Sequence, residues 1–205
     1  MGAEVGKPNS QMAVTSMTLT TPNIETPELT IILNELRIIA KNKNSEFVDK
    51  AELDSCLKKI EKFDAADLEL FNKLFILFDM KGDGTVNYKD YMSGIFGSFI
   101  TGSCMDRLKA ALAVYDEKGT RLCLKGDVKR MLFAINGVAS YFGDPVLSSA
   151  QLEETIHDLF GTVPKVTGQF IAHEPCLEFL VPHNNVQVFI RGLGRARFGL
   201  DPVPV

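Results

Sequence analysis

Apolar residues recur at three- and four-residue intervals along most of the chain, the spacing typical of amphipathic helices. The first run lies in residues 27–40, where Pro27 suits the first turn of a helix. Further helix starts are indicated by a capping residue followed three positions later by an acidic or amide residue: Asp49 with Glu52, Ser103 with Asp106, and Ser148 with Gln151. The pattern therefore predicts an all-α fold made of helix–loop–helix units.

One of the polar segments between these helices, residues 79–90 with the sequence DMKGDGTVNYKD, has the pattern of a calcium-binding loop. A hard divalent ion prefers several oxygen ligands at fixed positions, and a glycine at the sixth position allows the sharp turn. Gly84 occupies that sixth position. The candidate ligands are Asp79, Asp83, Thr85, Asn87 and Asp90.

Two positions in this segment depart from the pattern. Lys81 occupies a ligand position, and Asp90 is one methylene shorter than the glutamate that usually ends such a loop. We therefore expect the ammonium of Lys81 to pair with Asp79, Asp83 or Asp90 and to close the loop in place of an ion. The alternative is that one weakly bound Ca²⁺ or Mg²⁺ occupies the loop; no other cofactor is expected.

Three further segments, 41–52, 116–127 and 163–174, fit the same template with fewer of its ligands. A lysine stands at the third position of every loop: Lys43, Lys81, Lys118 and Lys165. The eighth positions are Val48, Val86, Cys123 and Phe170. Since the eighth residues of such loops pair as short strands, we expect the first loop to pair with the second and the third with the fourth.

The segments LFILFDMKGDGTVNYKDYMSG, GSCMDRLKAALAVYD and FVDKAEL resemble the EF-hand superfamily that includes calmodulin, calcineurin B, the neuronal calcium sensors and calaxin. The resemblance covers residues 27–180 and implies a calmodulin-like fold of four EF-hand units in two pairs, 27–100 and 101–192. A flexible N-terminal arm, 1–26, and a C-terminal tail, 193–205, complete the expected organisation.

The resemblance also implies an apolar groove that binds an amphipathic helix or coiled coil of another protein. The candidate groove residues are Met92, Phe96, Phe99, Met131 and Phe133. The function expected is that of a non-enzymatic adaptor or light-chain-like subunit, largely independent of calcium, in a cytoskeletal or axonemal assembly. The alternatives are a calcium or magnesium sensor that switches through loop 79–90 and a phosphatase regulatory subunit like calcineurin B.

Composition and short motifs limit the classes of partner and the cellular compartment that we expect. A net charge of −4 over 205 residues disfavours nucleic acid as the partner. The sequence contains no run of about 18 apolar residues, so no membrane span is predicted. The four cysteines form no CxxC pair of the kind typical of zinc sites. Neither a nucleophile motif nor a glycine-rich phosphate loop is present in the sequence. We expect a cytoplasmic protein, and the likeness to calaxin implies the axoneme of a cilium or flagellum.

Overall fold

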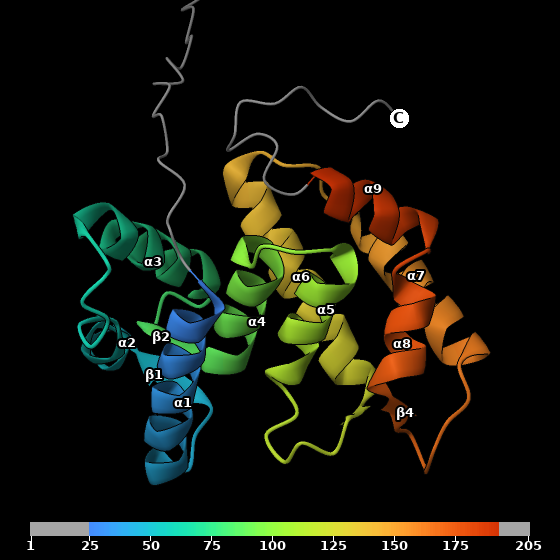
Figure 1. Ribbon diagram of the computed structural model, residues 1–205, viewed down its shortest axis with the longest axis horizontal. Helices are drawn as coiled ribbons and strands as arrows, with labels where there is room; N and C mark the ends of the chain where they lie inside the picture. The colour runs from blue at the N-terminus through green and yellow to red at the C-terminus, as the bar shows by residue number, and fades with distance from the viewer. Residues whose placement is uncertain (1–24, 193–205) are drawn as a thin grey trace, which may run out of the picture.

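Helices account for most of residues 25–192, the part of the chain that the computed structural model describes, and the all-α prediction is confirmed (Figure 1). The elements in chain order are α1 (Thr26–Lys43), β1 (Phe47–Asp49), α2 (Lys50–Leu57), α3 (Ala65–Phe78), β2 (Thr85–Asn87), α4 (Tyr88–Phe99), α5 (Cys104–Ala113), β3 (Leu122–Cys123), α6 (Lys125–Phe142), α7 (Ser149–Thr162), β4 (Ile171–Ala172), α8 (His173–Leu180) and α9 (Asn184–Gly192). The expected tail, 193–205, and residues 1–24 of the expected arm lie outside the described residues.

The three predicted capping boxes are all formed. At the start of α2 the carboxylate of Asp49 accepts a hydrogen bond from the backbone N–H of Glu52, and the Glu52 carboxylate accepts one from the backbone N–H of Asp49. Ser103 with Asp106 and Ser148 with Gln151 make the same reciprocal pairs at α5 and α7. Such caps satisfy amides that the first turn leaves free and contribute about 1 kcal/mol each.

The first two loops pair as the sequence predicts. Strands β1 and β2 run antiparallel, and Val48 lies directly opposite Val86 with both side chains buried. Near the first loop, however, α1 continues through Lys43, so the first three positions of the expected loop 41–52 are helical. Asn44 then ends the helix in the left-handed conformation, with φ of 49°.

The last two loops also pair, but the predicted register is wrong by one residue. Cys123 lies opposite Ile171 instead of Phe170. The chain makes a tight turn at Gly168, with φ of 54°, and Thr167 pairs with Phe170 across this turn in an isolated β-bridge. Strand β4 therefore begins one residue later than the template predicts. The buried Ile171 consequently takes the pairing position, and Phe170 is exposed.

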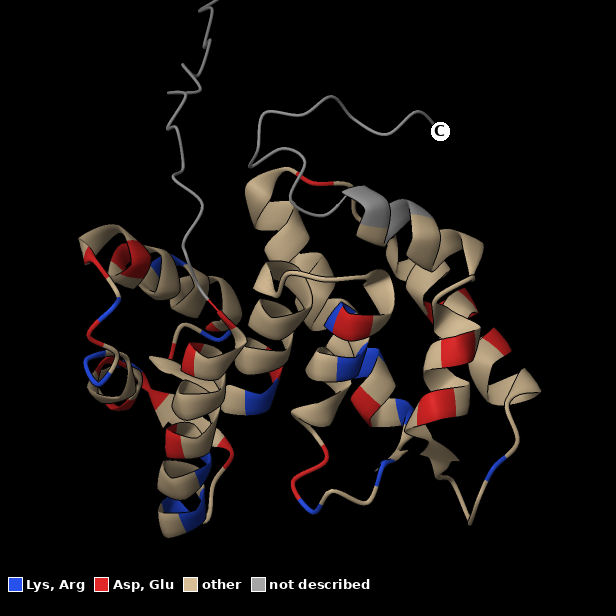
Figure 2. Cartoon of the chain, viewed as in Figure 1, with Lys and Arg blue, Asp and Glu red and all other residues tan. Residues whose placement is uncertain are grey.

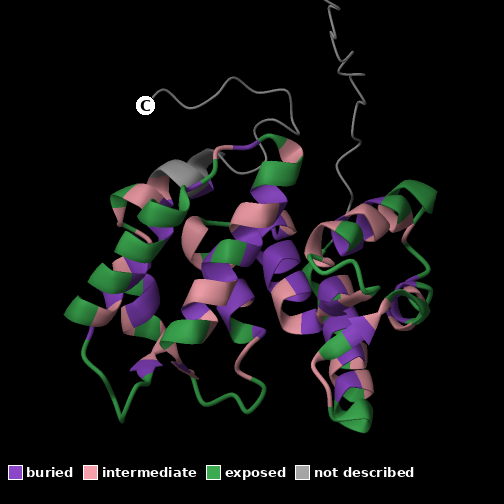
Figure 3. Cartoon of the chain, turned by 180° about the vertical axis from the view of Figure 1, so that it is seen from behind, coloured by how far each residue is buried: buried purple, intermediate pink, exposed green. Residues whose placement is uncertain are grey.

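Helix α4 lies at the centre of the molecule and packs against α1, α3, α5 and α6 (Figures 1 and 3). Its charged residues are both in the first turn, and the rest of the helix is uncharged, as the tan ribbon in Figure 2 shows. Two glycines face α6: a Cβ at Gly94 would lie 2.9 Å from the carbonyl oxygen of Ala134, and one at Gly97 would lie 2.5 Å from the Ile135 side chain. The absence of side chains at these positions lets α4 and α6 approach closely.

The buried core continues across residue 100, where the resemblance divides the chain into two pairs. A single cluster of buried apolar side chains reaches from α1 to α9. Polar contacts also cross the division, since the Ser93 hydroxyl donates to the Ala111 carbonyl at 3.0 Å. The guanidinium of Arg37 on α1 donates to the carbonyls of Ala113 and Val114 at the end of α5. The two halves therefore share one core.

The final helix, α9, was not predicted. Helix α8 ends at Leu180, two residues before Pro182. The chain then forms α9 against α7, with Val186 and Ile190 buried. The four-residue spacing of these two apolar residues is the signal that could have identified this helix.

Candidate functional site

Loop 79–90 makes the turn that its sequence predicts. Helix α3 ends at Phe78, and the Asp79 carboxylate accepts hydrogen bonds from the backbone N–H groups of Asp83, at 3.1 Å, and Gly84, at 2.9 Å. Gly84 adopts a φ of +77°, a left-handed conformation that glycine accommodates without steric cost. The first acidic side chain of the loop thus holds the loop's own backbone amides.

The next three candidate ligands, Asp83, Thr85 and Asn87, also bind groups of the protein. The Asp83 carboxylate accepts from both the backbone N–H and the hydroxyl of Thr85, at 3.0 and 2.7 Å. These hydrogen bonds, together with the nearby charge of Lys81, lower the pKa of Asp83. Asn87 caps α4, because its side-chain oxygen accepts from the backbone N–H groups of Lys89 and Asp90.

The last candidate ligand, Asp90, binds residues of the second half of the chain. Its Oδ1 atom accepts from Nε of Arg130 at 2.7 Å and from the Tyr115 hydroxyl at 2.9 Å. The Arg130 guanidinium also stacks over the Tyr115 ring, 5.1 Å from its centroid. A divalent ion coordinated by Asp90 would have to compete with this cation for the same carboxylate.

The expected role of Lys81 is wrong. Its Nζ atom lies 5.3 Å from the centroid of the Phe47 ring, and no carboxylate within residues 25–192 forms an ion pair with it. The backbone amides and Arg130 already satisfy Asp79 and Asp90, so the lysine packs over an aromatic ring at the edge of the loop instead.

In the first loop, a lysine ammonium does pair with a loop carboxylate, as was expected of Lys81 in the second loop. Lys43, at the third position of its template, forms an ion pair of 2.8 Å with Glu52 at the twelfth. Glu52 also accepts the capping hydrogen bond from the backbone of Asp49. An ammonium group thus binds the carboxylate that would serve as the final metal ligand of this loop.

A cluster of charged residues joins three of the loops. The ammonium of Lys89 lies 2.6 Å from the Glu46 carboxylate in the first loop and 2.7 Å from that of Glu117 in the third. Burial raises the pKa of Glu46, but hydrogen bonds from Lys89 and Asn87 outweigh it, so the net pKa lies below the ordinary value. The hydrogen bond from Lys89 likewise lowers the pKa of Glu117. These contacts fix the loops to one another through protein charges.

Within residues 25–192, no group of three or more His, Cys, Asp or Glu side chains is arranged to hold a metal ion. The carboxylates of Asp79, Asp83 and Asp90, which the sequence assigns to a metal, accept hydrogen bonds from amides, hydroxyls and a guanidinium. The geometry of this loop is that of a closed structural turn.

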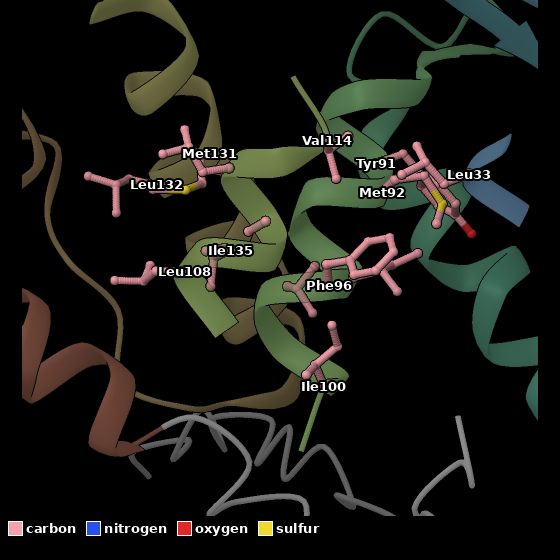
Figure 4. Close-up of a cluster of buried hydrophobic side chains, with 14 of the residues drawn as sticks. Leu33, Tyr91, Met92, Phe96, Ile100, Leu108, Val114, Met131, Leu132 and Ile135 are labelled. Atoms are coloured by element: carbon pink, nitrogen blue, oxygen red, sulfur yellow. The ribbon is translucent and has the colours of Figure 1, made fainter. Parts of the chain in front are cut away.

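Most of the predicted groove residues belong to the core. Met92, Phe96 and Met131 are buried, with exposed fractions of 0%, 4% and 0%, and Figure 4 shows them among packed core side chains, with Met92 beside Leu33 of α1. Phe99 is half-buried and packs edge-on against Phe142 at a centroid distance of 5.8 Å. The prediction is wrong for the three buried residues because neighbouring helices cover α4 on several sides. Only Phe133 of the predicted set is substantially exposed.

An apolar groove does exist at another place, between the end of α3, loop 79–90 and α6. Its volume is about 900 Å³, and Phe133 lies in its wall. Met80 is 92% exposed at its edge, and Phe47 and Val146 are also accessible. Met80 is not among the predicted groove residues, although its apolar side chain in an otherwise polar loop was the available signal.

Comparison of the chain with protein-family models and with curated proteins found no match to either. Across the described residues, no helix combines the length and apolar character needed to cross a bilayer.

Proposed function

We propose that the protein is a non-enzymatic adaptor of four EF-hand units, in which protein side chains replace metal ions and an apolar groove binds a helix of a larger assembly. The four helix–loop–helix units pair their loops in two antiparallel couples, the arrangement that the resemblance implies. The groove beside α6 carries the functional part of the proposal, because exposed apolar surface of this kind is typical of binding sites.

The closure of loop 79–90 supports independence from calcium. Oδ1 of Asp90 already accepts from Arg130 and Tyr115, and each oxygen of Asp79 accepts from a backbone amide. The positive charge of Arg130 would also repel a divalent ion at Asp90. A second candidate, the calcium or magnesium sensor, is favoured by one observation. Asp83 is exposed and lies close to the half-buried Asp79, in a loop that retains Gly84 at its turn.

The experiment that tests the adaptor function is selection from a displayed library of amphipathic helices on the immobilised full-length chain, with calcium and with a chelator. We expect helices to be selected equally in both conditions. Phe133→Asp places a charge in the groove wall and should abolish selection. Ile31→Asp changes a similarly exposed apolar residue of α1, outside the groove lining, and should leave selection intact.

Selection that requires calcium would favour the sensor. Helices that bind the Phe133→Asp variant as well as the wild-type protein would show that the groove is not the binding site. Thermal unfolding of both variants verifies that each is folded.

A further inference from the structure

The groove beside α6 is elongated. Its lining residues on α6 extend from Gly126 to Ser140 and recur at three- and four-residue steps, which places them in one stripe along the helix. At 1.5 Å per residue this stripe is about 20 Å long. A helix of about 14 residues has the same length, so the shape of the groove suits a helix lying alongside α6.

The charged residues that line the groove are mostly cationic, although the whole chain carries a net charge of −4. They are Lys81, Lys129 and Arg130, against the single anion Asp90. Arg130 and Asp90 neutralise each other through their 2.7 Å contact. The remaining cations of the lining are Lys81 and Lys129, of which Lys129 has an ion pair with Glu153 outside the lining.

These two lysines lie beside aromatic residues of the groove wall. The ammonium of Lys81 is 5.3 Å from the Phe47 ring centroid, and that of Lys129 is 5.6 Å from the Phe133 ring centroid. Lys129 also pairs with Glu153 of α7, which does not line the groove. A carboxylate that enters the groove could share or replace this exposed partner, and one near Lys81 would meet a cation that has no ion pair among residues 25–192.

We propose that the partner is an amphipathic helix with acidic residues on both sides of its apolar face. The inference rests on the proposed adaptor function and adds the chemistry of the partner. The apolar face of such a helix would contact Phe133, Val146 and Met80, and its flanking carboxylates would meet Lys81 and Lys129. A helix with basic flanks would bring like charges together and bind more weakly.

The experiment is the same library selection with the two flanking positions restricted to Glu, Gln or Lys. On the wild-type chain in low salt we expect Glu to be enriched over Lys about tenfold, the combined effect of two exposed ion pairs. The enrichment should fall as salt is raised. In the Lys81→Glu/Lys129→Glu double variant the preference should reverse to Lys.

The outcomes separate the partner chemistry from the adaptor function. If selected helices depend on Phe133 but favour Lys, or keep the same flanks in the double variant, the acidic partner is excluded and the adaptor function stands. If no helix binds the wild-type chain, or if Phe133→Asp has no effect on binding, the adaptor function fails together with this inference.

Discussion

The close approach of α4 and α6 predicts that Gly94→Ala is strongly destabilising. The added Cβ would lie 2.7 Å from Cζ of Phe78, 2.9 Å from the carbonyl oxygen of Ala134 and 3.1 Å from a methyl group of Val138. The two shortest separations are about 0.5 to 0.7 Å below ordinary van der Waals contact. Because one of the atoms is backbone, rotation of a side chain cannot relieve the overlap, and the two helices must separate.

The expected change in the free energy of unfolding for Gly94→Ala is the sum of two opposing effects. Alanine favours a helix over glycine by about 1 kcal/mol, whereas overpacking a core costs about 1–3 kcal/mol. With a backbone atom involved we take the upper end, which gives a net loss of about 2 kcal/mol and a melting temperature about 4–8 °C lower for a chain of this size.

Urea unfolding followed by circular dichroism measures this loss, and Gly137→Ala is the matched control. Gly137 is an interior residue of α6 whose Cβ would meet no atom within 4 Å, so the substitution should stabilise by up to about 1 kcal/mol. If Gly94→Ala is as stabilising as Gly137→Ala, the helices are not in the close contact that we describe.

Three further predictions concern the loops. Arg121 is held in the left-handed region, with φ of 56°; Arg121→Gly should therefore raise the free energy of unfolding by up to about 1 kcal/mol in urea titrations, while Arg121→Ala should bring no such gain. The pKa of Glu46 is lower in the folded chain than the value of 4.5 in the unfolded chain, so the ionised carboxylate stabilises the fold above pH 4.5 and this contribution is lost as the pH falls through the folded pKa. Glu46→Gln should therefore flatten the acid dependence of stability below about pH 4.5. Glu61→Gln, an exposed control outside the charged cluster, should not. In calorimetric titrations the wild-type chain should show no calcium binding at micromolar concentrations. The Lys81→Asp/Asp90→Glu double variant should gain such binding, because it restores two ligands. Micromolar binding to the wild-type chain would refute the closure of loop 79–90.

Local rules of capping and loop pairing were enough to predict much of the fold from the sequence. The capping boxes and the opposition of Val48 and Val86 depend on residues a few positions apart or on a fixed loop template. The fourth loop was misplaced because the extra residue of its turn at Gly168 has no counterpart in the template. The role of Lys81 was wrong for a different reason: Arg130, 40 residues after Asp90, supplies the competing cation, and sequence spacing gives no sign of that contact.

The misplaced groove has its cause in the composition of α4. Residues Tyr91–Ser98 are buried without interruption, so this helix has no polar face to mark an exterior. Helical periodicity identifies a groove only when one side of a helix is known to face solvent. For α4, Gly94 and Gly97 were the informative residues, because they let α6 pack closely on one side of the helix. Met92 and Phe96 lie on the opposite side at 100° per residue, and Met92 packs there beside Leu33 of α1. With α4 covered by its neighbouring helices, the apolar surface left for a partner lies between α3, loop 79–90 and α6, where Phe133 remains exposed.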